Sequence, residues 1–302
     1  MCNEGRVMKI APREFVAILC LFVPTALCAQ DMPLSQVLLE DENWELISEG
    51  HGYTEGPAVD AQGQIYFSDV KRSKIYKVDL EGEVHLFVEN SGRTNGLMFG
   101  ADGLLYACRM GDRQIVAYKP DGTHDVIASD VDSNDIAVTE SGNIYFSEPK
   151  AKRIWFIPKG EKPQVVAEEV SLNGLILWEN DETLVTTAGP DAWLWTFRIE
   201  ADGSLTSQEK YYQPLRLDTS FDIPGADGMT VDADGRVYVA TRAGLQMFDP
   251  TGRMGGVILK PQQKYMSNAT FGGPDLSYLY VTCSDKVYRR KTKTHGISNF
   301  LK

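Results

Sequence analysis

Hydrophobic and polar residues alternate along most of this chain in short runs, each ended by a polar turn. After Glu55 come a small apolar stretch (PAVD), a turn (AQGQ), an alternating strand (QIYFSDV), a polar turn (KRSK), a strand (IYKVD), a glycine turn (LEGE) and a last strand (VHLFVE). Alternation with a period of two residues is typical of β-strands. Four strands in one such unit is the number in a propeller blade.

The same order of strands and turns recurs along the chain, in residues 101–128 and 140–167 among others. A short polar signature precedes each unit and places one Glu, Asp or Asn at the same offset. It occurs six times, at Glu55, Asn95, Asn134, Asn173, Asp227 and Asn268, with spacings of 40, 39, 39, 54 and 41 residues. A period near 40 residues predicts an all-β, six-bladed β-propeller with four antiparallel strands in each blade.

The two ends of the repeat array complement each other. The last unit, after Asn268, stops one strand short, while residues 43–50 (NWELISEG) form a strand-like segment before the first full unit. Joining them would close the ring and remove two exposed sheet edges. The 54-residue step has a surplus in residues 207–226, for which we expect either an extended loop near the channel mouth or a lengthened outer hairpin.

The first 29 residues differ from the rest. Three basic residues precede the apolar run FVAILCLFVPTALCA, which ends in small residues, as in a cleaved export signal. The alternatives are a membrane anchor, for which the run is short and contains Pro24, and lipid attachment at Cys28, which the residues before it suit poorly. We therefore expect residues 1–29 to be a cleaved signal, 30–42 a linker and 43–302 a single propeller, in a periplasmic or secreted protein with no membrane contact after cleavage.

The overall composition limits the kinds of partner that the protein could bind. The 302 residues are 43% hydrophobic and 24% charged, which is typical of a globular chain, and the formal net charge is −12. Carboxylates are spread along the sequence, so a nucleic-acid partner is disfavoured.

Cys108 and Cys283 both follow strand-like residues, and we expect two buried thiols in separate blades, with a disulfide between them as the alternative. The sequence does not indicate an oligomeric state.

The six signature residues carry the candidate chemistry. The innermost strand of each blade lines the channel of a propeller, so a residue at the start of every inner strand would point into it near one face. Two carboxylates, Glu55 and Asp227, and four amides would then form a collar of oxygen donors. Calcium binds six to eight such ligands, so we expect Ca²⁺, with Zn²⁺, Mn²⁺ and Mg²⁺ as alternatives.

A simpler interpretation is available for each signature alone. Asn-Gly and Asp-Gly before a strand are ordinary turn formers. Local turns do not require the same offset in six repeats, however, and Glu55 is a poor turn residue. The four histidines are scattered and none forms a metal-ligand pair, and the His closest in sequence to a signature is His51.

These residues resemble a known family. The segments EGPAVD, SNDIAV, LNGLILW, ADGMTVD and GGPDLSYLYVT, with the strands IYFSD and VYVAT, are similar to the SMP-30/gluconolactonase/LRE-like propellers over roughly residues 45–290. The resemblance implies metal ligands at Glu55, Asn173 and Asp227, and a ligand or substrate contact at Asn134. It also implies that Asp227 acts as acid/base. Asn95, in the same collar, and Arg109, after a blade strand, are the further candidates for substrate binding, and Asn268 is an outer ligand or a turn residue.

The implied reaction is hydrolysis of a lactone or related ester. A cation would polarise the carbonyl while Asp227 exchanges a proton with water and the leaving alkoxide; alternatively, Asp227 mainly holds the metal. Some sugar lactonases carry an Arg two residues before the SND-type Asn, but here that residue is Asp132, which casts doubt on sugar-acid lactones. Arg93, Arg109 or Arg242 could supply a cation instead.

Two other function classes remain open. One is a non-catalytic propeller that binds a ligand or protein and uses the metal structurally. The other is a metal-independent lyase or synthase, which would not need Glu55 and Asp227 together.

Overall fold

The structure is a computed structural model, and it describes residues 32–178 and 181–297. The expected signal, residues 1–29, lies outside the described residues. Its cleavage and the export of the protein therefore stay predictions.

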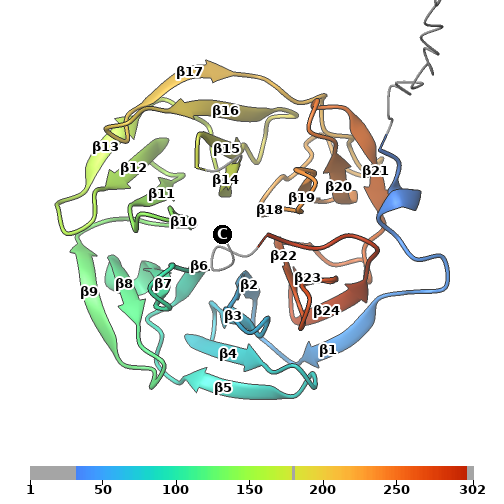
Figure 1. Cartoon of the computed structure of the whole chain (residues 1–302), viewed down its shortest axis with the longest axis horizontal. Coiled ribbons are helices and arrows are strands. Elements are labelled where there is room, and N and C mark those ends of the chain that lie inside the picture. The colour runs from blue at the N-terminus through green and yellow to red at the C-terminus, as the bar shows by residue number, and fades with distance from the viewer. Residues whose placement is uncertain (1–31, 179–180, 298–302) are drawn as a thin grey trace, which may run out of the picture. The chain divides into compact units, whose positions relative to one another are not determined.

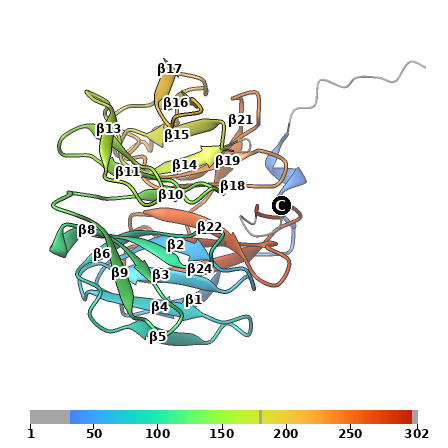
Figure 2. The ribbon, with the colours of Figure 1, turned by 60° about the vertical axis from the view of Figure 1, so that its left-hand side comes forward.

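Six four-stranded antiparallel sheets form a ring around a central channel (Figure 1), which confirms the predicted six-bladed propeller. The first three blades are β2 (Thr54–Val59) to β3 (Ile65–Asp69), β4 (Lys74–Val78) and β5 (Val84–Val88); β6 (Thr94–Phe99) to β7 (Leu105–Arg109), β8 (Gln114–Tyr118) and β9 (His124–Ser129); and β10 (Ile136–Val138) to β11 (Ile144–Glu148), β12 (Arg153–Ile157) and β13 (Gln164–Ala167). The other three are β14 (Leu175–Trp178) to β15 (Thr183–Thr187), β16 (Leu194–Ile199) and β17 (Leu205–Glu209); β18 (Met229–Val231) to β19 (Val237–Thr241), β20 (Gly244–Phe248) and β21 (Met254–Ile258); and β22 (Asn268–Gly272) to β23 (Tyr278–Cys283), β24 (Lys286–Lys291) and β1 (Glu45–Glu49). In Figure 2 the strands β2 to β5 follow one another outward from the centre.

Aspartates in the turns explain how the strands are delimited. The side chain of Asp60 accepts hydrogen bonds from the backbone N–H groups of Gln62 and Gln64, between β2 and β3. Asp249 does the same for Thr251 and Arg253 between β20 and β21. A short acidic side chain thus satisfies the turn backbone that the strands leave unpaired.

The hydrophobic core lies between neighbouring blades. One cluster joins Tyr66 and Ile75 of the β2–β5 blade to Leu105 and Val116 of the β6–β9 blade. On its other side, β3 buries Phe67 with Tyr280 and Val287 of the last blade. The two faces of this blade thus pack against its two neighbours, and the blades hold one another at fixed positions around the channel.

Strand β1 closes the ring as the sequence predicts. It pairs antiparallel with β24, so the last blade contains strands from both ends of the repeat array. Ion pairs reinforce this pairing, from Arg289 Nε to Glu45 at 2.7 Å and from Lys286 Nζ to Glu49 at 2.8 Å. The ring thereby avoids an unpaired edge at its seam.

The segment before β1, which we expected to be a linker, packs against the propeller. It forms a short 3₁₀ helix, η1 (Leu34–Gln36), and the following Val37 is fully buried in the core between the last two blades. A second short 3₁₀ helix, η2 (Met110–Asp112), follows β7. No helix in the described ranges is long and apolar enough to cross a membrane.

The surplus of the long repeat is an extended loop, one of the two forms we expected. After β17 the chain runs without strands from residue 210 to 228, and it buries Tyr212 and Leu215 against the β18–β21 blade. The Gln246 side chain holds the loop by accepting from Arg216 N–H and donating to Arg216 O, both at 2.8 Å. The end of this loop leads directly into Asp227.

Cys108 and Cys283 are free, buried thiols on β7 and β23, as the preferred prediction stated.

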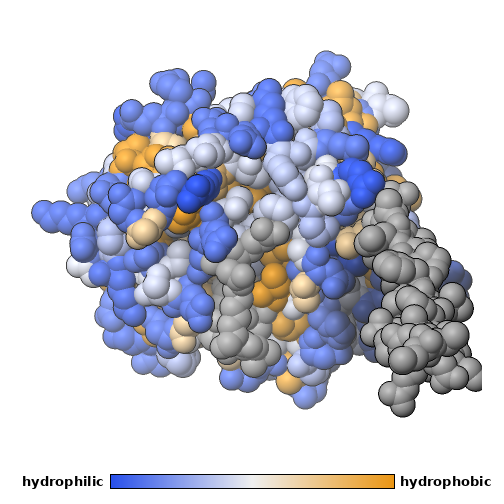
Figure 3. Space-filling view, turned by 45° about the horizontal axis from the view of Figure 1, so that its top comes forward, coloured by the Kyte–Doolittle hydropathy of each residue, from blue (hydrophilic) through white to orange (hydrophobic). Residues whose placement is uncertain are grey.

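On the face shown in Figure 3, hydrophilic residues predominate and hydrophobic residues form scattered patches.

Candidate metal and active site

All six signature residues lie at or just before the start of an inner strand. Glu55, Asn95 and Asn268 are in the first two residues of β2, β6 and β22, while Asn134, Asn173 and Asp227 stand two residues before β10, β14 and β18. Because the inner strands surround the channel, the backbone brings these positions to one end of it (Figure 1).

Close contact between neighbouring inner strands explains why a glycine follows most of the signature residues. A Cβ at Gly174 would lie 2.5 Å from the carbonyl oxygen of Asp227, and one at Gly228 would overlap the side chain of Asn268. The inner strands approach each other too closely at the collar for any side chain at these positions. The Asn-Gly and Asp-Gly pairs therefore serve close packing around the channel as well as local turns.

Asp135 occupies one of these glycine-equivalent positions and is a site residue that the sequence argument missed. Its carboxylate accepts a hydrogen bond from Ile136 N–H at 3.0 Å. Gly96, on the neighbouring inner strand, leaves room for it, since a Cβ there would lie 2.5 Å from Asp135 Oδ1. The signal in the sequence was an acidic residue in SND where other repeats have Gly.

The two predicted carboxylates are buried and have amide partners. Glu55 is 4% exposed and its Oε2 accepts from Gly56 N–H at 3.1 Å, while the side chain of Asn268 also hydrogen-bonds it. Asp227 is 9% exposed and its Oδ1 accepts from Asn173 Nδ2 at 2.6 Å. The structure thus brings Asn173 and Asp227 into direct contact, and their roles as metal ligands stay predictions.

Burial raises the pKa values of the carboxyl groups in the collar. Desolvation, followed by repulsion from Asp135, raises the pKa of Asp227 to about 7. Desolvation raises the pKa of Asp135 to about 6. The pKa of Glu55 is also raised, first by desolvation and then by the charges of Asp227 and Asp135. None of the interactions that set these three pKa values comes from a cationic side chain.

Tyr265, which is distant in sequence from Asp227, contacts its carboxyl, and Arg242 packs against the ring of Tyr265. The hydroxyl of Tyr265 donates a hydrogen bond to Gly225 O at 2.8 Å. It also contacts the Asp227 carboxyl, and this second contact lowers the pKa of Asp227. The guanidinium of Arg242 lies over the ring of Tyr265, 5.6 Å from its centroid, and over that of Phe221 at 4.2 Å. Arg242, one of the expected cations, is therefore held by aromatic faces beside the collar.

A cavity of about 680 Å³ opens beside the collar and contains two of the expected residues, Asn134 and Asn173. Met110, which also lines it, receives a weak contact from Asn95 Nδ2 at 3.9 Å. Arg109 is not among its lining residues; its guanidinium instead binds Asp112 at 2.6 Å and the Tyr118 hydroxyl at 3.0 Å. The substrate roles given to Asn134, Asn95 and Arg109 stay predictions.

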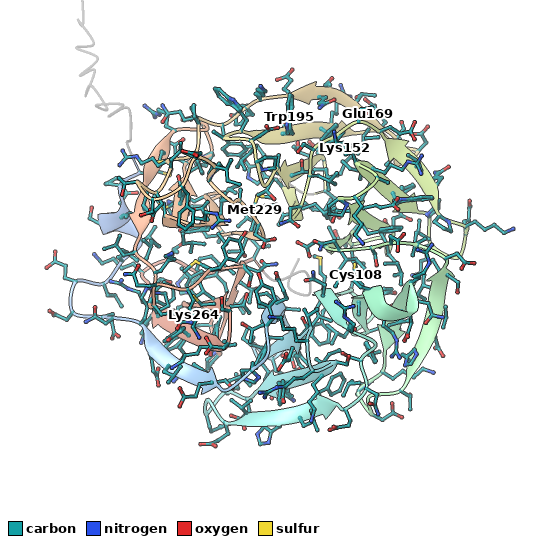
Figure 4. All side chains as sticks on the ribbon, turned by 180° about the vertical axis from the view of Figure 1, so that it is seen from behind. Cys108, Lys152, Glu169, Trp195, Met229 and Lys264 are labelled. Atoms are coloured by element: carbon teal, nitrogen blue, oxygen red, sulfur yellow. The ribbon has the colours of Figure 1, made fainter. Side chains whose placement is uncertain are left out.

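The channel behind the collar is narrower and apolar. Its cavity of about 160 Å³ is lined by inner-strand residues such as Leu97, Leu175 and Met229, and Asp135 and Asn268 reach it. Met229 lies at the inner edge of its blade in Figure 4, whereas Trp195 lies far from the channel. Apolar side chains thus predominate along the channel between Asp135 and Asn268 at the collar end and Asp181 at the other end.

His51 is a core residue. Its ring packs edge-on against Phe67 and Tyr76, with centroids 5.1 and 4.9 Å away. Its Nε2 contacts Ser48 Oγ at 2.6 Å, and its Nδ1 lies 3.6 Å from an Asp69 oxygen.

Among the described residues, no group of three or more His, Cys, Asp or Glu side chains could hold a metal, so amides would have to complete a donor set.

The amino-acid sequence of the chain is similar to those of known proteins. A family model described as SMP-30/gluconolactonase/LRE-like region matches residues 53–285. The chain is 24% identical to a gluconolactonase of Zymomonas mobilis, over 97% of this chain and 87% of that protein, and 26% identical to a pentonolactonase of Haloferax volcanii, over 72% and 77%.

Solved structures share the fold. A gluconolactonase from Xanthomonas campestris has a TM-score of 0.75 at 22% identity, with 86% of this chain and 92% of that chain covered. A calcium-binding protein, regucalcin, from Agrobacterium tumefaciens has a TM-score of 0.72 at 18% identity, with 85% and 96% covered. These likenesses show the six-bladed architecture.

Proposed function

The chain belongs to the SMP-30/gluconolactonase/LRE-like family, and from this premise we propose that it is a divalent-cation-dependent hydrolase of a lactone or related ester. The observation that carries the proposal is the set of buried carboxyls in the collar, Glu55, Asp135 and Asp227, whose surroundings contain amides but no cationic partner. The lactonase names of the relatives support the substrate class.

The residues present fit a divalent cation. Buried carboxylates that are neither protonated nor paired are costly, because they lose hydration without a compensating charge. A cation held by Glu55, Asp227 and the amide oxygen of Asn173, with Asn134 adjacent, would remove that cost. These donors are all hard oxygens, which favours Ca²⁺ over Zn²⁺, since Zn²⁺ is bound more often by His and Cys.

The bound cation would supply Lewis acidity toward the carbonyl oxygen of the ester. Asp227 would accept a proton from water as the water oxygen bonds to the carbonyl carbon, and the C–O ring bond would then break. The same proton would pass to the leaving alkoxide, giving a hydroxy acid. The hydrogen bond from Asn173 Nδ2 to Asp227 Oδ1 orients the carboxyl for this exchange.

Asp227 would have two tasks that compete, because a carboxylate that binds a cation is a weaker base. The alternative assignment gives Asp227 to the metal alone and leaves proton transfer to solvent. The substitution Asp227→Asn separates these assignments, since Asn keeps an oxygen donor and loses the base.

The test is proton release from a panel of lactones and esters, with chelated protein and after addition of Ca²⁺, Mg²⁺, Mn²⁺ or Zn²⁺. We expect turnover only with a cation, and a loss of about 100-fold or more in kcat for Asp227→Asn. The control is Asp181→Asn, because Asp181 lines the channel cavity at the opposite ends of the inner strands. Stabilisation by metal without turnover of any ester would instead indicate a non-catalytic binding propeller.

A further inference from the structure

The cavity beside the collar has a basic side. Besides Asn134 and Asn173, its lining contains Arg93, Lys150 and Lys152. Resting on the proposed lactone hydrolysis, we propose that these three cations bind an anionic group of the substrate, so that the substrate is a lactone bearing a carboxylate or phosphate away from the ester that is cleaved.

The three cations come from two adjacent blades. Arg93 directly precedes β6, and Lys150 and Lys152 lie in the turn between β11 and β12, where Figure 4 labels Lys152. All three side chains are exposed and line the same cavity as the amides of Asn134 and Asn173. A volume of about 680 Å³ is within the range of small-ligand sites.

The charge of this cavity is the reverse of that of the whole chain. The sequence has 42 acidic and 30 basic residues, yet among the residues that the structure describes, Asp132 is the only acidic one in the cavity lining. Asp132 is already paired with Arg113, which also donates to Asp130 O at 3.1 Å. No ion pair of Arg93, Lys150 or Lys152 is found within residues 32–178 and 181–297, so these charges are available to a ligand.

This arrangement resolves the doubt raised by Asp132. A free aspartate at that position would repel an anion, but Arg113 neutralises it. Lys150 and Lys152, in the lining of the same cavity, would supply the cationic function that some sugar lactonases place there. Ammonium groups bind carboxylate or phosphate as point charges and do not need the bidentate geometry of arginine.

The position of the cations fits a substrate with charge at one end. The lactone carbonyl would lie at the collar, near Asn173 and Asp227, and the anionic group would lie toward Lys150 and Lys152. A neutral lactone would use the same collar without contacting the charges. The preference should therefore appear as a difference between matched substrates and should weaken with added salt.

The test compares a neutral lactone, D-glucono-1,5-lactone, with D-glucaro-1,4-lactone, which bears a carboxylate, and 6-phospho-D-gluconolactone, which bears a phosphate. For the double variant Lys150→Gln, Lys152→Gln, we expect kcat/KM for the preferred anionic lactone to fall about 5- to 20-fold more than kcat/KM for the neutral one. The control is Lys162→Gln, an exposed lysine of the same blade outside the cavity lining, which should leave the ratio unchanged. The larger effect among the two anions identifies carboxylate or phosphate.

The outcomes separate the two proposals. Normal turnover of the neutral lactone with an unchanged substrate ratio in the double variant would overturn the anion site and leave the hydrolase intact. If the wild-type protein hydrolyses no lactone, the hydrolase proposal fails, and calorimetric binding of gluconate and of glucitol, its uncharged analogue, decides on the anion site. Weaker gluconate binding by the double variant, with glucitol binding unchanged, would support it; unchanged gluconate binding would overturn it.

Discussion

Replacing Asp227 by Asn should stabilise the metal-free protein while it impairs metal binding. The carboxyl is buried, and its pKa rises from 3.8 to about 7 in the fold. A rise of about three pKa units corresponds to about 4 kcal/mol at a pH where the group is ionised in both states. Asn173 can still donate to the remaining oxygen, so the substitution removes the charge and keeps that hydrogen bond.

The pH dependence of this effect has a defined sign. Because the folded protein holds the Asp227 proton more tightly than the unfolded chain does, this carboxyl favours the fold most below about pH 4 and loses that contribution as the pH rises through about 7. In urea denaturation with a chelator, Asp227→Asn should therefore raise the free energy of unfolding by about 2–4 kcal/mol at pH 8, and by about a third of that at pH 5.

Saturating Ca²⁺ should narrow this difference in stability. A ligand at about 100 times its Kd stabilises a protein by about 2.7 kcal/mol, and the variant should gain less because it has lost a charged ligand. Asp181→Asn is again the control. If Asp227→Asn is no more stable than the wild-type protein at pH 8 in chelator, or shows the same pH dependence, then Asp227 is not an uncompensated buried acid and the argument for a cation loses its basis.

Three further predictions concern the scaffold. Gly228→Ala should lower the free energy of unfolding by about 1–3 kcal/mol, since its Cβ would overlap the next inner strand, whereas Gly189→Ala, with no heavy atom nearer than 3.7 Å, should change it by less than about 0.5 kcal/mol in the same urea titration. Ile47→Ala should cost about 1–2 kcal/mol by removing a contact of the ring-closing strand with the core, and the exposed Leu46 should tolerate Ala; equal losses in calorimetry would mean that β1 does not pack as described. Burial lowers the pKa of His51, so its protonation opposes folding, and stability should fall as the pH drops below about 6.5; His51→Gln should show a shallower fall in melting temperature between pH 7.5 and 5, and an unchanged slope would refute this origin.

The sequence predicted the architecture well because a propeller repeats one local pattern. Each blade is encoded by short alternating runs and turn residues such as Asp60, and the closing strand at residues 45–49 was visible as the missing member of the last unit. Packing of Val37 was not predictable, since the apolar side chains of residues 30–42 do not follow the alternation of a blade strand and give no sign of where they pack.

The candidate site was predicted where the repeat itself carried it. Glu55, Asn173 and Asp227 stand at equivalent offsets, and the structure brings Asn173 and Asp227 into contact. Tyr265 belongs to a different repeat segment from Asp227, and nothing in its local sequence relates it to the collar. Lys150 and Lys152 lie in an ordinary polar turn, and the pairing of β10 with β11 within one blade places that turn on the same cavity as Asn134.

The location of the cation tests the central claim most directly. Crystals of the chelated protein soaked in Mn²⁺ would reveal the metal by anomalous X-ray scattering. We predict a peak at the collar with oxygen atoms of Glu55, Asn173 and Asp227 among its ligands, and no such peak in Asp227→Ala. A collar without metal, in crystals whose protein needs Mn²⁺ for lactone turnover in solution, would contradict the account.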